Sequence, residues 1–210
     1  MDSGIMQMLT RLADLVILNL LFLITSIPVL TIGAALTAMS YTNLKLKENE
    51  GYVVKNYFRS FRENLKQSTL IWMIFLFLLV IFGTDFYVIR SMEGIAGNVI
   101  KIGVLVCMLI WMMTFLYVFP LQARFYNGIR HTIVNAFLLT TANFPRTFVM
   151  LVISAAAVVA TLWNGSTLWF GILVWILLGF SLLSYLNISL MHGIIQKMMP
   201  QEEEMQGNEN

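Results

Sequence analysis

The sequence has little charge and almost no cysteine. Only 11% of its 210 residues are Asp, Glu, Lys or Arg, and Cys107 is the single cysteine. A soluble domain of ordinary composition carries about a quarter charged residues, so the composition indicates a membrane protein. One thiol within an apolar run excludes a disulfide framework inside this chain and a cysteine-based metal site.

The motifs of common enzyme classes are also missing. The chain has no HExxH, no GxSxG and no glycine-rich loop followed by Lys-Ser or Lys-Thr. No apolar segment carries paired carboxylates or a His–acid cluster, and the two histidines, His131 and His192, lie far apart in sequence. We therefore expect a protein that is not an enzyme, with no catalytic residue, no cofactor and no metal ion.

Long apolar runs are what the sequence has in abundance, since 59% of its residues are hydrophobic. About 20 apolar residues cross the hydrocarbon core as a helix, and a helix satisfies its own backbone hydrogen bonds in lipid. The predicted fold is all-α: a polytopic transmembrane helical bundle of five spans, forming a single domain over residues 1–199. The expected spans cover about residues 12–39, 68–89, 102–123, 147–162 and 168–190. The acidic tail, residues 200–210, is too polar to bury and is expected to be disordered.

The distribution of Lys and Arg between the connecting segments predicts the orientation. Residues 45–67 contain six basic residues and residues 124–146 contain three, whereas residues 163–167 contain none and residues 90–101 only two. The two basic loops and the C-terminus are therefore expected on the cytoplasmic side. With five crossings the N-terminus is then external.

The first apolar run, residues 12–39, is too long for one straight span and has a proline, Pro28, in its middle. A single kinked crossing and a re-entrant segment that returns at Pro28 are both open. Each half of a re-entrant segment has about 14 residues, or roughly 21 Å of helix, which is short of the ~30 Å hydrocarbon core. The single kinked crossing is therefore the favoured prediction.

Polar and helix-breaking residues inside this run are the candidate intramembrane site. Asp14 either pairs with Arg11, three residues earlier, or contacts a substrate or partner. Asn19 is expected to bond a neighbouring helix, with the polar strip at Ser181, Ser184 and Asn187 as candidate partners. Pro28 marks either a packing kink or a discontinuous helix that forms a substrate site. The full candidate set is Asp14, Asn19, Thr25, Pro28, Thr31 and Gly33.

Two amphipathic helices are predicted in the cytoplasmic loops. In residues 52–67, apolar side chains recur at helical spacing, at Val54, Tyr57, Phe58, Phe61 and Leu65. A second, basic stripe suits either an anionic lipid surface or a cytoplasmic partner. Residues 127–143 repeat the apolar face, at Ile129, Ile133, Phe137 and Leu138. The candidate docking or lipid-facing basic residues are Lys55, Arg59, Arg62, Lys66, Arg124 and Arg146.

Several short motifs resemble those of one known family. They are Ala13-Asp14-Leu15, Asn19-Leu20-Leu21-Phe22, Ser26-Ile27-Pro28, the run from Thr31 to Ala38, Phe58-x-x-Phe61-x-x-Asn64-x-x-Gln67 and the run from Phe119 to Phe125. Together they resemble the YesL-like family of bacterial integral membrane proteins, whose molecular function is unknown. The resemblance implies a multi-pass protein of the bacterial inner membrane, encoded in many cases beside carbohydrate uptake systems of the ABC type. It implies no catalytic residues.

Two functions are compatible with these observations. The first is a non-enzymatic accessory or scaffold component of a carbohydrate transport system, with the lipid bilayer and ABC-type sugar transporter components as partners and no nucleic acid. The alternative is a small solute transporter whose site lies at the broken first helix.

Overall fold

The structure is a computed structural model that describes residues 4–125 and 127–207. These residues form helices and no strand, as the sequence predicts. The α-helices are α1 (Gly4–Thr25), α2 (Ile32–Lys47), α3 (Val53–Ile89), α4 (Gly94–Arg124), α5 (Ile129–Ala142), α6 (Phe144–Leu162), α7 (Gly165–Val174) and α8 (Phe180–Gly207). A 3-10 turn at Val29–Thr31 precedes α2, and a π-helix at Trp175–Gly179 joins α7 to α8.

Five helical segments of the described chain are long and apolar enough to cross a membrane. They are Met6–Thr25, Val53–Ile89, Gly94–Arg124, Phe144–Leu162 and Gly165–Gln196. The protein is therefore a multi-pass membrane protein by helix length and composition. Each of the last four predicted spans lies within one of these segments.

The first predicted span differs from the prediction, because residues 12–39 form a helical hairpin and not one kinked crossing. Helix α1 stops at Thr25, and α2 returns beside it. At the open end, Arg11 Nη2 donates to Asn49 Oδ1 at 2.7 Å; at the turn, Thr31 Oγ1 donates to the carbonyl of Thr25 at 2.6 Å. Pro28 has extended backbone angles and no N–H to donate, so it ends the first helix and permits the reversal.

This hairpin changes the relative placement of the chain's first helix. The hydrogen bond from Arg11 brings the first turns of α1 beside the loop after α2, where Asn49 adopts a left-handed conformation with φ of 63°. The single-crossing prediction put the N-terminus and this basic loop on opposite sides of the membrane. The structure puts the start of α1 and the loop on one side of the molecule.

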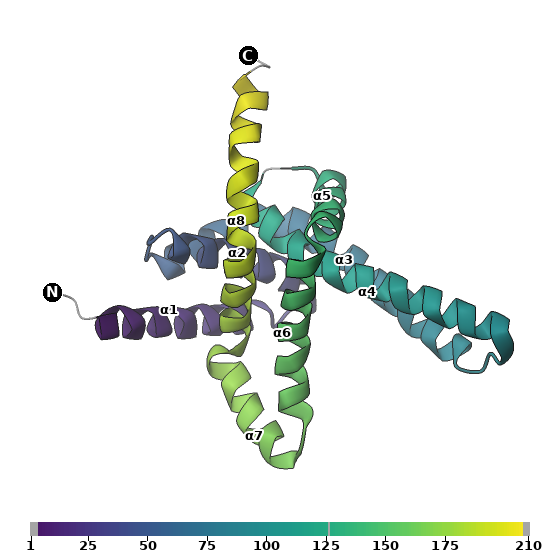
Figure 1. The fold of residues 1–210 in the computed structure, drawn as a ribbon. Helices are drawn as coiled ribbons and strands as arrows, with labels where there is room; N and C mark the ends of the chain where they lie inside the picture. The colour runs from purple at the N-terminus through teal and green to yellow at the C-terminus, as the bar shows by residue number, and fades with distance from the viewer. Residues whose placement is uncertain (1–3, 126, 208–210) are drawn as a thin grey trace.

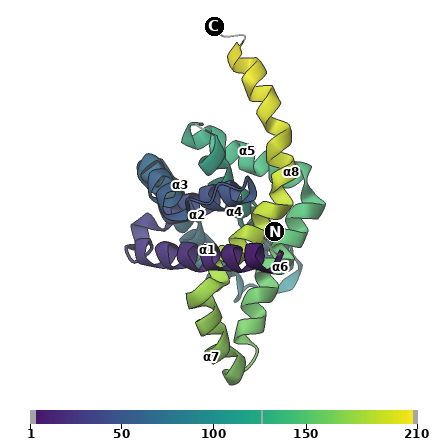
Figure 2. The same cartoon turned by 90° about the vertical axis from the view of Figure 1, so that its left-hand side faces the viewer.

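The helices do not all run in one direction (Figures 1 and 2). Helices α3 and α4 form one long arm, and α6 and α7 form a second arm that points elsewhere. Helix α1 lies across the α7–α8 segment in both views, and α2 runs close to it. The protein is thus a bundle of crossing helix pairs.

The first predicted amphipathic helix is not a separate element. Residues 53–67 are the first turns of α3, which continues without a break into the predicted second span, because no proline or glycine interrupts residues 52–82. The buried face of this part is Val53, Tyr57, Ser60, Asn64 and Ser68, whereas Val54 and Phe58 of the predicted apolar face are exposed. The second predicted amphipathic helix is a separate element, α5.

Helix α8 is drawn to Gly207 and so includes residues 200–207 of the predicted tail. After Pro200, Gln201, the three glutamates and Met205 are good helix formers. Residues 208–210 of the predicted tail lie outside the described residues.

Buried side chains form two apolar clusters. One joins α1, α2 and the start of α3 around Leu18 and Tyr57, and the other joins α3, α4, α6 and α8 around Ile71, Tyr117 and Met191. Helix α2 lies between them and contributes to both. The hairpin is therefore anchored in the protein interior.

Candidate functional site

Asn19 is fully buried where α1 crosses the α7–α8 segment. Its amide nitrogen donates to the carbonyls of Trp175 at 3.0 Å and Ile176 at 2.7 Å, and its amide oxygen accepts from the Ser181 N–H at 3.0 Å. The two carbonyls belong to the π-helix, whose widened turn leaves backbone groups without their regular partners. One side chain from α1 satisfies these groups and fixes the crossing.

Ser181 strengthens the same crossing. Its hydroxyl donates to the carbonyl of Leu15 on α1 at 2.7 Å, and Asn43 on α2 donates to Ser184 Oγ at 3.0 Å. The expectation that Asn19 bonds the polar strip of the fifth span is confirmed for Ser181, through its backbone. Asn187, in contrast, donates to Ser154 on α6 at 3.3 Å.

The hairpin turn is held by hydroxyl groups. Thr25 Oγ1 and the buried Tyr57 hydroxyl lie 2.5 Å apart, and Thr31 Oγ1 also donates to the Pro28 carbonyl at 2.8 Å. Trp72 Nε1 on α3 donates to the carbonyl of Val29 at 2.9 Å. Pro28 itself is exposed at the tip, so it shapes the turn and does not line a buried site.

Gly33 has a packing role. A Cβ built on Gly33 would overlap the Ser68 carbonyl oxygen and lie 2.6 Å from Trp72 Cβ. The absence of a side chain lets α2 approach α3 closely, as small residues do between membrane helices. A second contact, between Thr37 Oγ1 and Ser68 Oγ at 2.8 Å, lies one turn further along.

Asp14 is partly buried on α1. The Arg11 guanidinium is used elsewhere, by Asn49 and by the Tyr185 hydroxyl at 3.3 Å. Among the ion pairs of the described residues, none joins Arg11 to Asp14. The expected pairing of these two side chains is therefore not formed.

The predicted basic residues fall into three places. Lys55, Arg59, Arg62 and Lys66 are all exposed on one face of the first turns of α3; we call these four residues the basic face. Arg59 Nε pairs with Glu63 at 3.1 Å within that helix. Arg146 is exposed in the first turn of α6.

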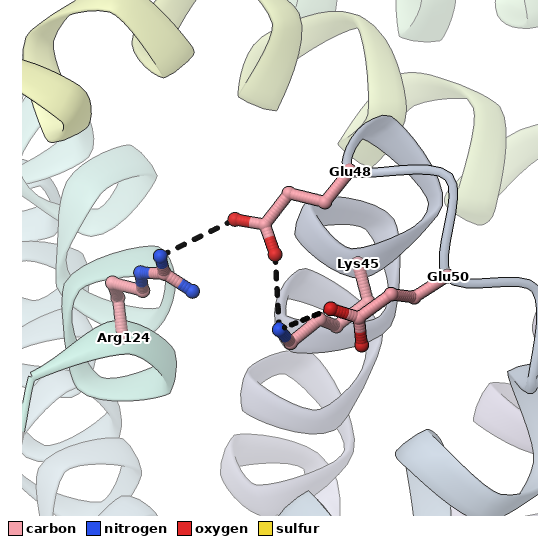
Figure 3. Close-up of polar contacts among 4 residues, drawn as sticks. All are labelled: Lys45, Glu48, Glu50 and Arg124. Carbon is pink, nitrogen blue, oxygen red and sulfur yellow. Dashed lines mark hydrogen bonds and ion pairs between the residues drawn. The ribbon is translucent and has the colours of Figure 1, made fainter.

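Arg124 belongs to an ion-pair network and not to the basic face (Figure 3). Its Nη2 lies 3.2 Å from Glu48 Oε1, and Lys45 Nζ lies 2.9 Å from Glu48 Oε2 and 3.0 Å from Glu50 Oε1. The hydrogen bond to Glu48 raises the pKa of Lys45. This network ties the end of α4 to the loop between α2 and α3.

A chain of buried amides and hydroxyls was missed by the sequence reasoning about sites. Gln122 Nε2 on α4 donates to Asn64 Oδ1 on α3 at 3.2 Å, and Thr132 Oγ1 on α5 donates to Gln122 Oε1 at 3.2 Å. The signal was present, because Asn64 and Gln122 are both residues of the family-like motifs. Buried amides in apolar surroundings need partners, so two such residues on neighbouring helices are candidates for each other.

A large cavity lies between α2, α3, α4, α6 and α8, with a volume of about 450 Å³. Its lining contains none of the six predicted intramembrane residues. Among the residues whose side chains are described, no three His, Cys, Asp or Glu side chains come together as a metal site. Asn19, Thr25, Thr31 and Gly33 thus hold the hairpin in place, and the open space is elsewhere.

Comparison with known proteins gives one match. Residues 15–86 match the model of a family described as a protein of unknown function, DUF624. The match runs from α1 through most of α3 and includes the hairpin turn and the basic face. No curated protein and no solved structure matches the chain. The hairpin and the following helix are therefore the part of this chain that is similar to an uncharacterised family.

Proposed function

We propose that this protein is a non-enzymatic accessory component of a membrane transport system and binds a partner protein through the basic face of α3. The observation that carries the proposal is the division of this helix into two sides. Tyr57, Ser60 and Asn64 are buried against the rest of the protein, while the four residues of the basic face are exposed.

This division favours a protein partner over simple lipid attachment. An amphipathic helix that lies on a membrane buries its own apolar face in the lipid. Here the buried face of the first turns of α3 is already covered by protein. The exposed side offers the charges of Lys55, Arg62 and Lys66, beside the Arg59–Glu63 ion pair. These positive charges complement an acidic surface on another protein.

The nature of the partner follows from the family resemblance and remains part of the proposal. A YesL-like protein of the bacterial inner membrane would have components of an ABC-type sugar transporter as its partner. The match to an uncharacterised family over residues 15–86 supports the likeness, because it covers the hairpin and the basic face.

We also propose a topology of four crossings and one re-entrant hairpin. The arms α3–α4 and α6–α7–α8 supply the crossings, and both basic loops lie in the cytoplasm. Because α1 begins beside the loop that follows α2, the N-terminus shares the cytoplasmic side with the C-terminus. Four is an even number of crossings, and an even number places both termini on the same side of the membrane.

The partner is tested by crosslinking in native membranes followed by affinity purification and mass spectrometry. The full chain is compared with Arg62→Glu/Lys66→Glu, which reverses two charges of the basic face. We expect a specific partner on the native chain and its loss from the variant. The control is Arg130→Glu, an exposed basic residue of α5, which should keep the partner. The same partner yield from all three chains, or no partner on the native chain, contradicts the proposal.

The alternative of a solute transporter with its site at the broken first helix has weaker support. The Asn19 amide and the hydroxyls of Thr25 and Thr31 are all bonded within the protein. Solute flux into liposomes that falls on Asn19→Leu, at unchanged protein content and stability, would favour this alternative.

A further inference from the structure

The cavity between the two arms is apolar and lined by aromatic rings. Trp72 and Phe75 of α3 and Trp111 and Phe115 of α4 form one wall, with ring centroids 5.5 to 6.3 Å apart where they pair. Its volume of about 450 Å³ lies within the ~300–1,000 Å³ of small-molecule sites. The space is open on one side, so a molecule can enter it from outside the protein.

The position of the cavity indicates where the occupant comes from. Most of its lining residues fall within the predicted spans of α3, α4, α6 and α8, and Leu36, Met39 and Ser40 come from α2. Leu79 and Met112 of the lining are 44% and 41% exposed, and they lie on helices whose outer surface is apolar along this stretch. The cavity therefore opens sideways toward the lipid chains and not toward water.

Polar atoms in the lining indicate a second property of the occupant. Asn187 is only 8% exposed, and its amide oxygen has no hydrogen-bond partner in the protein. Its amide nitrogen donates to Ser154 Oγ. Exchange of the amide oxygen and nitrogen would leave the nitrogen unpartnered instead, so one amide atom stays unsatisfied in either orientation. Trp111 Nε1, also in the lining, is a buried donor without a partner.

We propose that this cavity binds one membrane amphiphile, with its hydrocarbon chain against the aromatic wall and a hydroxyl group at Asn187. A hydroxyl both donates and accepts, so it satisfies either face of the Asn187 amide. A buried amide left unpaired is costly, which gives the site a preference for an alcohol over a pure hydrocarbon. This binding is independent of the proposed partner at the basic face.

The test uses the full chain in lipid nanodiscs and a photoreactive octadecanol that carries a diazirine in its chain. Labelled peptides are identified by mass spectrometry. We expect saturable labelling of residues on α3, α4 and α8 that line the cavity. Unlabelled octadecanol should compete at about tenfold lower concentration than octadecane, the difference expected for one hydrogen bond.

Variants locate the site. Leu151→Trp fills the cavity from α6 and should abolish the saturable labelling. Val152→Trp adds the same side chain at the next, exposed position outside the lining and should leave it unchanged. Asn187→Leu should retain binding and lose the preference for octadecanol. Size-exclusion chromatography confirms that each variant is folded.

Three results would overturn the proposal. The first is labelling of the native chain that rises without saturation over all lipid-facing helices, the pattern of surface lipid. The second is equal competition by octadecane and octadecanol. The third is unchanged labelling of folded Leu151→Trp. Two of these outcomes are measured on the native chain and do not depend on any variant.

Discussion

At the scale of the residue, the Asn19 side chain bonds three backbone groups of the segment that joins α7 to α8. Asn19→Leu would leave the carbonyls of Trp175 and Ile176 and the Ser181 N–H without their side-chain partner. Side-chain hydrogen bonds between membrane helices contribute roughly 0.6–2 kcal/mol each. We expect the free energy of unfolding in detergent to fall by about 1–3 kcal/mol, with faster hydrogen exchange confined to residues 175–181. Leu20→Val, at an exposed neighbouring position, is the control, and unchanged exchange in Asn19→Leu would refute the role.

Two glycine substitutions, one at the contact between α2 and α3 and one away from it, test the close approach of these two helices. Gly33→Ala places a Cβ against the Ser68 backbone, which can yield only if the helices separate. Overpacking of this kind costs about 1–3 kcal/mol. Gly103→Ala on α4 meets nothing within 4 Å and should be neutral or stabilise the helix by about 0.5–1 kcal/mol. The measurement is thermal unfolding of both variants in the same detergent. If the close approach matters, Gly33→Ala lowers the melting temperature, whereas Gly103→Ala leaves it unchanged or raises it.

Lys45 gives a prediction for pH dependence. Its pKa is raised in the folded protein by the hydrogen bond to Glu48. A raised pKa means that the pair contributes stability below the unfolded pKa of about 10.4, and that the contribution is lost as the pH rises through the folded pKa. Glu48→Gln should therefore lose stability at neutral pH, by less than about 1 kcal/mol for a pair so near the surface, and show less of the alkaline decline. An identical alkaline decline in both chains would show that the pair is energetically silent.

At the scale of the element, the sequence indicated where helices end better than how they pair. Pro28 and the apolar runs predicted the break and the helical segments from local physics. The direction of α2 after the break depends on two hydrogen bonds, Arg11 to Asn49 and Thr25 to Tyr57. These bonds join residues that are 38 and 32 positions apart in the sequence. No local pattern contains that information, so the sequence predicted the break at Pro28 but not the return of α2 beside α1.

The π-helix shows the same limit. The stretch from Trp175 to Gly179 has no residue that signals a widened turn. Its carbonyls are stabilised by Asn19, more than 150 positions earlier in the chain. Of the candidate site, the sequence identified Asn19, Thr25 and Gly33 as special, and their roles became clear only from the helices that they contact.

At the scale of the whole molecule, the hairpin predicts which side of the membrane α1 faces. In a Cys107→Ala background, Thr10→Cys should resist a membrane-impermeant maleimide on intact cells and react once the membrane is permeabilised. Asn164→Cys, in the short turn between α6 and α7, is the control and should react on intact cells. Labelling of Thr10→Cys on intact cells would place the start of α1 outside, as a single crossing of the first apolar run predicts. It would contradict the re-entrant hairpin.

The length of α3 has a mechanical consequence. Its 37 residues form one unbroken helix, about 55 Å long and nearly twice the ~30 Å thickness of the hydrocarbon core. Its exposed positive end and its far turn at Arg90 belong to the same stiff rod, with the hairpin packed along only the first part. A tilt of about 10° about the middle of such a rod moves each end by about 5 Å. A displacement of the end that carries the basic face is therefore transmitted along the rod to the end at Arg90.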